Sequence, residues 1–148
     1  MAIAGDTSTL FQAGVIAYRI RHGKVQILLM TSRDTGRWII PKGNIKPGTT
    51  PSKAAEQEAF EEAGVKGTIA SSTPLGMYAY SKKLGSGELR AATVEVYLLK
   101  VERQVNNWPE RQERKLAWVS PKKAVSRVDE PGVVPLLLRL IEVEGDLS

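Results

Sequence analysis

Cysteine is absent from this chain of 148 residues, and His22 is the single histidine. The lack of cysteine excludes disulfides, thiolate zinc sites and a cysteine nucleophile, and it is compatible with a reducing cytosol. No apolar run approaches the length that a membrane-spanning helix needs. Met1–Gln12 has no basic segment followed by a long apolar run, so we expect no signal peptide. These absences favour a cytoplasmic protein that contacts no membrane.

Dense runs of like charge are also missing, although the chain is basic overall. Lys and Arg number 21 against 16 Asp and Glu, which gives a formal net charge of +5. Such a charge is explained equally well by solubility and by a polyanionic partner. The basic residues are spread along the chain, and no aromatic-rich RNA-binding strand motif is present. A small, highly phosphorylated partner therefore fits better than a long nucleic acid.

Strands and helices are expected in an order that indicates one layered domain spanning residues 1–148. Alternating or continuous apolar segments predict strands at 13–20, 25–30, 73–82, 89–101 and 116–119. The segment 38–40 is short and apolar, and Pro41 ends it. The segment 42–49 holds two glycines and a proline and is expected to be a loop, as is the polar segment 105–115. Helices are expected at 51–63, 121–125 and 133–143. His22 falls in the turn of the first hairpin, where a catalytic role is not expected.

The helix expected at 51–63 has clear start and stop signals. Thr50 is suited to cap it, Pro51 suits its first turn, and Gly64 suits its C-terminal end. A strip of small residues, with Phe60 beside it, predicts that one side of this helix packs on a flat surface such as a sheet; the strip consists of Ala55, Ala59 and Ala63.

Three carboxylates lie on the same helix with a spacing that brings them together. Glu58, Glu61 and Glu62 stand at positions i, i+3 and i+4 and therefore share one patch. Like charges at this spacing repel each other and weaken a helix, whereas a hard divalent cation such as Mg²⁺ takes oxygen ligands and reverses the sign of the interaction. The loop before the helix leads to a helix N-terminus, where anions bind well. These residues therefore favour a site that binds a metal ion together with phosphate.

The segment 43–65 resembles the Nudix box, which runs glycine, five residues, glutamate, seven residues, then Arg-Glu-apolar-x-Glu-Glu-x-Gly-apolar. The positions that match with intact spacing are Gly43, Glu58, Ala59, Glu61, Glu62, Gly64 and Val65. The resemblance implies an α/β/α sandwich with a mixed sheet between helices. It also implies hydrolysis of a diphosphate linkage with Mg²⁺ or Mn²⁺, in which Glu58, Glu61 and Glu62 are catalytic metal ligands and Gly43 adds a backbone carbonyl.

Two positions depart from the box. Thr49 replaces its first glutamate, and Gln57 replaces the arginine that pairs with a box glutamate in the family. Gln57 can form hydrogen bonds but supplies no charge. The departures leave the three carboxylates in place. They also leave two interpretations open, namely slower catalysis with less well oriented glutamates, or transfer of the arginine's role to another residue.

Residues outside the box narrow the range of substrates that we expect. Pro41-Lys42-Gly43, together with Trp108-Pro109-Glu110 ahead of Arg114 and Trp118, resembles the branch that holds diphosphoinositol polyphosphate phosphohydrolases and diadenosine polyphosphate hydrolases. The alternatives are hydrolysis of nucleoside triphosphates or of an RNA 5′ pyrophosphate. A weakly catalytic Nudix module that senses nucleotides or binds proteins is a third alternative.

Further residues are candidates for binding or catalysis. Lys42, Arg37 and Arg33 precede the helix and are candidates to bind phosphates. An additional ligand or base is sought among Glu95, Glu110 and Glu113, each of which is more often an ordinary surface residue. Trp38 is expected in the core, whereas Trp108, in a polar loop, is a candidate to cover a substrate.

Overall fold

The computed structural model describes residues 9–147 and contains one mixed sheet of eight strands. The N-terminal half of the chain supplies β1 (Leu10–Arg21), β2 (Lys24–Thr31), β3 (Trp38–Ile39), β4 (Lys42–Asn44) and β5 (Val65–Ile69). The rest supplies β6 (Gly76–Lys83), β7 (Leu89–Gln104) and β8 (Leu116–Val119). The helices are α1 (Pro51–Ala63), α2 (Pro121–Arg127) and α3 (Val134–Glu142), with short 3-10 turns at Pro131–Val133 and Glu144–Asp146.

The long strands β1 and β7 form the centre of the sheet and run parallel to each other. The main path of the sheet is β3-β2-β1-β7-β5, and β4, β6 and β8 pair with β1, β7 and β2. All these other pairs are antiparallel. The mixed sheet predicted from the sequence is therefore confirmed.

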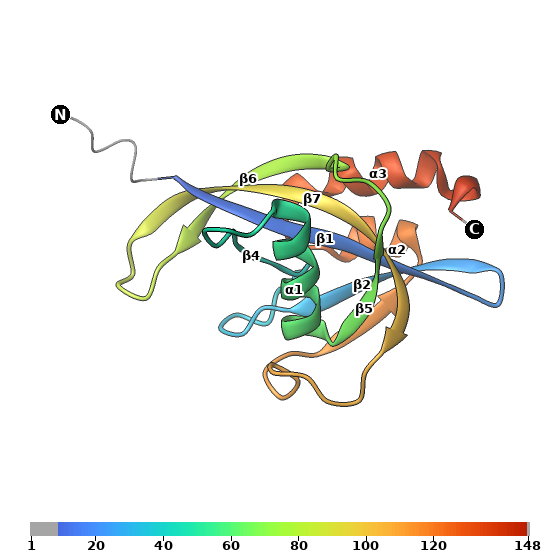
Figure 1. The fold of residues 1–148 in the computed structure, drawn as a ribbon, viewed down its shortest axis with the longest axis horizontal. Helices are drawn as coiled ribbons and strands as arrows, with labels where there is room; N and C mark the ends of the chain where they lie inside the picture. The colour runs from blue at the N-terminus through green and yellow to red at the C-terminus, as the bar shows by residue number, and fades with distance from the viewer. Residues whose placement is uncertain (1–8, 148) are drawn as a thin grey trace.

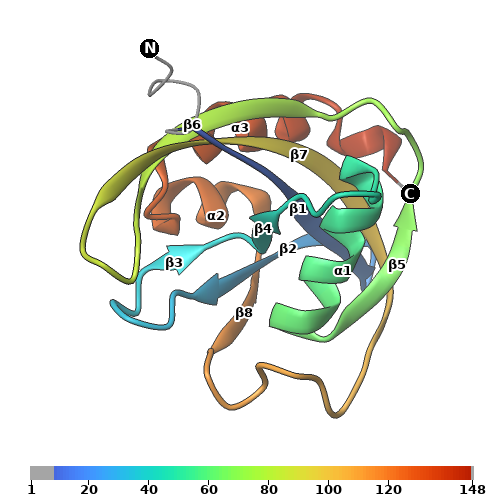
Figure 2. The same ribbon diagram turned by 60° about the vertical axis from the view of Figure 1, so that its left-hand side comes forward.

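Helices cover both faces of the sheet (Figures 1 and 2). Successive residues of β1 point to opposite faces, and each face has its own apolar cluster. Val15 and Ala17 pack with α1 on one side, while Ile16 packs with α2 and α3 on the other. The α/β/α arrangement expected from the sequence is thus the observed one.

Helix α1 begins and ends where its sequence signals predict. The Thr50 side chain accepts a hydrogen bond from the Lys53 backbone N–H at 3.3 Å, and Pro51 opens the first turn. Gly64 ends the helix with a left-handed φ of 68°, which glycine adopts at little cost. The buried face consists of Ala54, Ala55, Ala59 and Ala63, which let the helix lie close to β1.

Two predictions about the segments flanking α1 are wrong. The segment 42–49 was expected to be a loop, but its first three residues form β4, in which Gly43 pairs with Ala13 of β1. Val65–Ile69 was not expected as a strand, yet β5 pairs with β7 directly after α1. Both strands are short, and two of their residues are glycines, so neither has the apolar alternation that predicts a strand. Together they fix both ends of the segment 43–65 to the sheet.

No helix among residues 9–147 is long and apolar enough to cross a membrane. The expectation for Met1–Gln12 concerns residues that, up to Ser8, lie outside the described part of the chain.

Candidate active site

Glu58 and Glu62 are neighbouring carboxyl groups at the junction of α1 and β4. The negative charge of Glu58 raises the pKa of Glu62. Glu62 is only 7% exposed, and its Oε1 accepts a hydrogen bond from the backbone N–H of Lys42 at 3.1 Å. Glu58 is half-buried. The one-turn spacing of the two residues on α1 therefore places both acidic groups against the strand that precedes the helix.

Gly43 faces Glu58 at very close range. A Cβ atom built on Gly43 would lie within 2.6 Å of all three atoms of the Glu58 carboxyl group. Position 43 thus accepts only glycine unless Glu58 moves. The contact also places the main chain of β4 directly beside a box carboxylate, which fits the resemblance's implication that Gly43 offers a carbonyl at the same site.

Burial raises the pKa of both carboxyl groups. The pKa of Glu62 is raised to about 8, first by burial and then by the negative charges of Glu58 and Glu110, while Arg114 and the Lys42 N–H act in the opposite direction. The pKa of Glu58 is raised by burial and by Glu61. Two carboxylates that are buried together favour their charged forms only when positive charge is brought to them.

The donor set fits a hard divalent cation, although it is not a complete cage. Within residues 9–147, no three acidic or histidine side chains converge closely enough to hold an ion by themselves. Mg²⁺ is commonly bound through one or two carboxylates and keeps several waters. Glu58 and Glu62 supply two such oxygen donors, and Gly43 lies beside them without a side chain to block access.

The loop between β7 and β8 passes close to the end of α1, as Figures 1 and 2 show, and a backbone hydrogen bond joins the two segments. The Glu110 N–H of the loop donates to the backbone carbonyl of Glu61 at 3.0 Å. Arg114 donates from Nε to Glu110 Oε1 at 2.8 Å, and its Nη2 lies 3.7 Å from Glu62 Oε2. Of the three carboxylates considered outside the box, Glu110 is the one whose charge acts on both Glu58 and Glu62.

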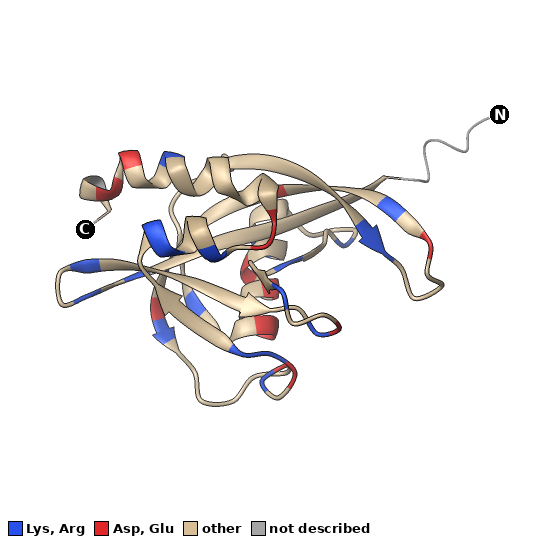
Figure 3. Cartoon of the chain, turned by 180° about the vertical axis from the view of Figure 1, so that it is seen from behind, with Lys and Arg blue, Asp and Glu red and all other residues tan. Residues whose placement is uncertain are grey.

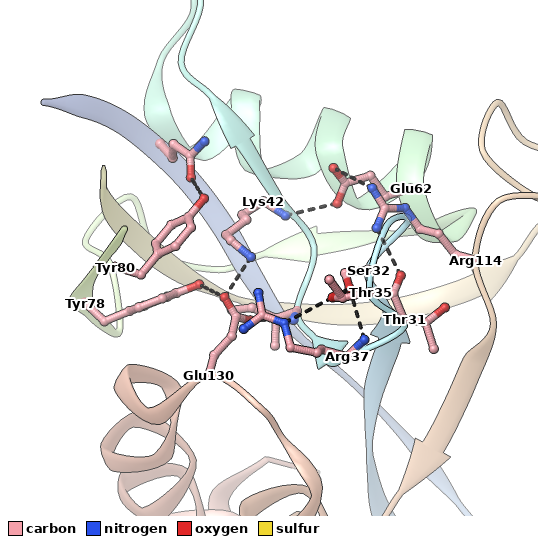
Figure 4. A network of polar contacts seen from close by, with 12 residues as sticks. Thr31, Ser32, Thr35, Arg37, Lys42, Glu62, Tyr78, Tyr80, Arg114 and Glu130 are labelled. Atoms are coloured by element: carbon pink, nitrogen blue, oxygen red, sulfur yellow. Dashed lines mark hydrogen bonds and ion pairs between the residues drawn. The ribbon is translucent and has the colours of Figure 1, made fainter. Parts of the chain in front are cut away.

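Lys42 lies between two buried carboxylates, as Figure 4 shows. Its backbone contacts Glu62 on one side, and its Nζ lies 2.7 Å from Glu130 Oε2 on the other. Glu130 also accepts hydrogen bonds from the Ile40 N–H at 3.0 Å and the Tyr78 hydroxyl at 2.8 Å. The Lys42 ammonium is therefore already paired. Its predicted contact with phosphate stays a prediction and requires the ammonium to be shared with Glu130 or released from it.

Arg33 and Arg37 lie in the exposed loop between β2 and β3. Arg33 pairs with Glu113 at 3.2 Å, so it links its loop to the β7–β8 loop. Arg37 Nε donates to the Thr35 hydroxyl at 3.2 Å and has a largely exposed side chain. The structure thus separates the three predicted phosphate-binding residues: the two arginines are exposed, whereas the side chain of Lys42 is only 10% exposed. In Figure 3, basic residues are spread over several strands and loops, whereas acidic residues cluster on α1.

Thr49 and Gln57, the two residues that depart from the box, line a hollow on the outer side of α1. This hollow has a volume of about 710 Å³ and lies between α1, β5 and the loop that precedes the helix. Thr49 and Gln57 line it together with Phe60, Glu61 and Lys46. The side chain at position 57 therefore faces open space and not the buried pair of Glu58 and Glu62.

The remaining candidates have other surroundings. Glu95 is half-buried on β7 and contacts the Tyr97 hydroxyl at 3.5 Å. His22 is exposed in a turn with a positive φ of 54°. Trp38 packs against the cluster on the α2 and α3 side. Trp108 lies against Gly64, where a side chain on the glycine would overlap its ring; this position anchors the β7–β8 loop to the end of α1.

Sequence reasoning assigned no role to Arg114, Glu130, Tyr78 or Tyr80. For Arg114 a weak signal exists, because Glu110 and Arg114 have the i, i+4 spacing of an ion pair. Glu130 and the two tyrosines have no such signal, since they join Lys42 from segments far apart in the chain. Tyr80 lies under the Lys42 ammonium, with 5.1 Å between Nζ and the ring centroid, and donates to Gln12 at 2.7 Å.

Comparisons with known proteins agree with this geometry. The NUDIX domain model matches residues 10–140. Nudix hydrolase 12, mitochondrial, of Arabidopsis thaliana is 34% identical over 105 residues, which cover 69% of this chain and 51% of that protein. Diphosphoinositol polyphosphate phosphohydrolase 3-beta of Bos taurus is 30% identical over 119 residues, which cover 77% of this chain and 66% of that protein. The chain thus spans about half to two thirds of the length of these relatives.

A solved structure gives the same fold. The crystal structure of a C. elegans Ap4A hydrolase binary complex superimposes with a TM-score of 0.68 and covers 93% of this chain and 99% of that one. The sequence identity is 22%, so this likeness bears on the fold alone.

Proposed function

Because this chain belongs to the Nudix family, we propose that it is a metal-dependent hydrolase that cleaves a diphosphate linkage in a nucleoside- or inositol-linked polyphosphate. Diadenosine polyphosphates and diphosphoinositol polyphosphates are the favoured substrates. The whole chain, 1–148, is proposed to form a single domain of this family, and its cytoplasmic location stays a prediction. Some relatives carry the word mitochondrial in their names.

The observation that carries this proposal is the pair formed by the half-buried Glu58 and the buried Glu62 beside Gly43. Both carboxyl groups have a pKa raised by burial and by neighbouring negative charge. Such a pair is costly in an ordinary protein interior and is typical of a site that receives a cation. The box resemblance, the fold and this pair all point to the same location.

The residues proposed to hold Mg²⁺ or Mn²⁺ are Glu58 and Glu62, with the carbonyl of Gly43. Glu61, the third box carboxylate, lines the outer hollow and is proposed to join them by turning its side chain toward the ion. When bound, the ion neutralises phosphate charge and lowers the pKa of water. Lys42 orients Glu62 through its N–H. One of the carboxylates is proposed to take the proton from the attacking water, and Glu110 is placed to contribute because its charge acts on both members of the pair.

Arg33 and Arg37 are proposed to bind the phosphates of the substrate. Both lie in an exposed loop on the side of the box that Glu113 and the β7–β8 loop approach. Arginine suits this role because its planar group forms paired hydrogen bonds with phosphate. Lys42 joins them only if its ammonium leaves Glu130 or contacts both groups. The proposed partner is thus a small phosphorylated molecule, and among nucleic acids only an RNA 5′ end would fit.

A panel of pyrophosphates tests the proposal. The purified chain is incubated with Mg²⁺ or Mn²⁺ and with diadenosine polyphosphates, diphosphoinositol polyphosphates, nucleoside triphosphates, NDP-sugars and 5′-triphosphorylated RNA. Phosphate release and product identity are measured for each. We expect the fastest turnover with the first two classes and none with a chelator present. Turnover limited to triphosphates or RNA would replace the substrate assignment, and binding without any turnover would favour a sensing module.

A further inference from the structure

Arg114 has an unusually enclosed position for a cation on a loop. Its side chain is 7% exposed, and its guanidinium contacts acceptors on three separate segments. Nε donates to Glu110 Oε1 at 2.8 Å, Nη1 donates to the Thr31 carbonyl at 3.1 Å, and Nη2 lies 3.7 Å from Glu62 Oε2. The rigid geometry of the group means that the first two contacts fix the direction of the third.

The contact with Glu62 is distinctive among the ion pairs of the protein. Within residues 9–147, it is the ion pair that includes one of the box carboxylates. Each oxygen of Glu62 then has its own partner: Oε1 accepts from the Lys42 N–H, and Oε2 faces Arg114. The carboxylate is therefore held from two sides, by the Lys42 N–H and by Arg114.

Gln57 does not supply this charge. It stands where the Nudix box has an arginine, and it is neutral. It lies five positions before Glu62, so the two side chains leave the helix about 140° apart. Its side chain lines the outer hollow beside Thr49, away from the buried pair.

We propose that Arg114 is the positioning residue for Glu62, so that the β7–β8 loop supplies the positive charge that holds this carboxylate. Arg114 does not touch the substrate or the ion in this arrangement. It orients the Glu62 carboxylate through its contact with Oε2. The inference rests on the proposed function, because it assumes that Glu62 is a metal ligand.

The direct test measures metal affinity and not turnover. Mn²⁺ binding is followed by electron paramagnetic resonance for the unaltered chain and for Arg114→Met, which removes the charge but keeps most of the length. Loss of a residue that supports a metal ligand typically lowers affinity by about ten- to a hundredfold, and we expect a rise in Kd in that range. Arg111→Met is the matched control: it makes the same change on the same loop at an exposed residue, and its Kd is expected to stay within about twofold.

A second variant covers the case in which Arg114→Met fails to fold. Arg114→Lys keeps the positive charge but cannot reach three acceptors in fixed directions, so we expect a folded protein with an intermediate Kd. A combined variant asks whether Arg114 acts through Glu62. If it does, Arg114→Met has little additional effect on Mn²⁺ affinity in a Glu62→Gln background, because interacting residues are not additive.

The outcomes separate the inference from the function on which it rests. If Glu62→Gln binds Mn²⁺ as tightly as the unaltered chain, the proposed metal site is wrong, whatever Arg114 does. If Glu62→Gln weakens binding while folded Arg114→Met or Arg114→Lys binds as before, the metal site stands and the role of Arg114 is overturned. Full additivity in the combined variant would likewise show that Arg114 acts independently of Glu62.

Discussion

The carboxyl group of Glu58 occupies the space in which a side chain at Gly43 would lie, since a Cβ there would come within 2.6 Å of its carbon and both its oxygens. Gly43→Ala therefore forces Glu58 away from β4. We expect the hydrolysis rate to fall by about a hundredfold, because misplacement of a catalytic group by about 1 Å has effects of this size. Steady-state kinetics with Mg²⁺ measure the loss, and circular dichroism checks the fold.

Gly85→Ala is the control for this substitution. Gly85 lies in a turn where a Cβ would meet nothing within 4 Å, so both rate and fold should be unaltered. A Gly43→Ala enzyme with full activity would contradict the close packing of Glu58 and β4.

Removal of one carboxylate charge should abolish most activity. Glu62→Gln keeps the shape of the side chain but removes a ligand charge, and we expect a rate loss on the order of a hundredfold or more. A chelator should eliminate the activity of the unaltered chain, and added Mg²⁺ or Mn²⁺ should restore it. The fold should survive, because the substitution relieves repulsion between Glu62 and Glu58. An unchanged rate would remove Glu62 from the site.

Stability of the metal-free protein should fall as pH rises from about 5 to 8. The pKa of Glu62 is about 8 in the folded chain, against a usual value of 4.5. Between those values the folded state holds a proton that the unfolded state has released, so a rise in pH favours unfolding. Tm is measured by calorimetry in the presence of a chelator. Glu62→Gln should flatten this pH dependence, whereas Glu142→Gln, an exposed control, should not.

Divalent cations should reverse that trend. Metal binding requires deprotonated carboxylates and therefore strengthens as pH rises. The increase in Tm on addition of Mg²⁺ should be larger at pH 8 than at pH 6. An equal increase at both values would indicate that the ion binds elsewhere.

Restoration of the box arginine should be tolerated. Gln57 faces a hollow of about 710 Å³, which has room for a longer side chain. We expect Gln57→Arg to fold normally and to keep its activity or raise it by a few-fold at most, since a charge-assisted contact is stronger than a neutral one. Kinetics and a thermal melt are sufficient to test this. A large loss of activity would mean that the glutamine takes part in a brace of its own and would weaken the roles assigned to Glu58, Glu61 and Glu62.

Salt should discriminate between substrates of different charge. If basic residues such as Arg33 and Arg37 attract a polyanion, kcat/KM should fall as salt rises from about 0.05 to 0.3 M, because the Debye length shortens. The fall should be steeper for a substrate with five or six phosphates than for an NDP-sugar. Equal dependence would assign the effect to general surface charge and favour a simpler nucleotide diphosphate as substrate.

The fold around the box could be predicted because its signals are local. Thr50, Pro51 and Gly64 mark the ends of α1. The one-turn spacing of Glu58 and Glu62 places these two against β4, whereas Glu61, which was expected in the same patch, lines the outer hollow. The alternation in β1 and β2 predicts the hairpin, and the alanine strip predicts the contact with the sheet. Each of these signals lies within a few residues of the structure that it determines.

The surroundings of the carboxylates could not be predicted in the same way. Arg114 forms an ion pair with Glu62, although the two residues are 52 positions apart in the chain. Glu130, in the segment before α3, forms an ion pair with Lys42. Side chains of this kind meet because β8 and α2 return the chain to the sheet, and no periodicity in the sequence records that return. Likewise, β4 forms because β1 offers it a partner, and its own residues do not favour a strand.

The two contacts of Lys42, with Glu62 and with Glu130, restrict which substitutions this chain can accept during evolution. Lys42 joins two segments: its N–H contacts Glu62 on α1, and its ammonium contacts Glu130 in the loop before α3. A substitution at position 42 or 130 alone leaves a buried charge without its counterpart, whereas a joint replacement by an apolar pair avoids that penalty. Positions 42 and 130 are therefore expected to vary as a unit among natural homologues, and laboratory selection should recover double replacements there more readily than single ones.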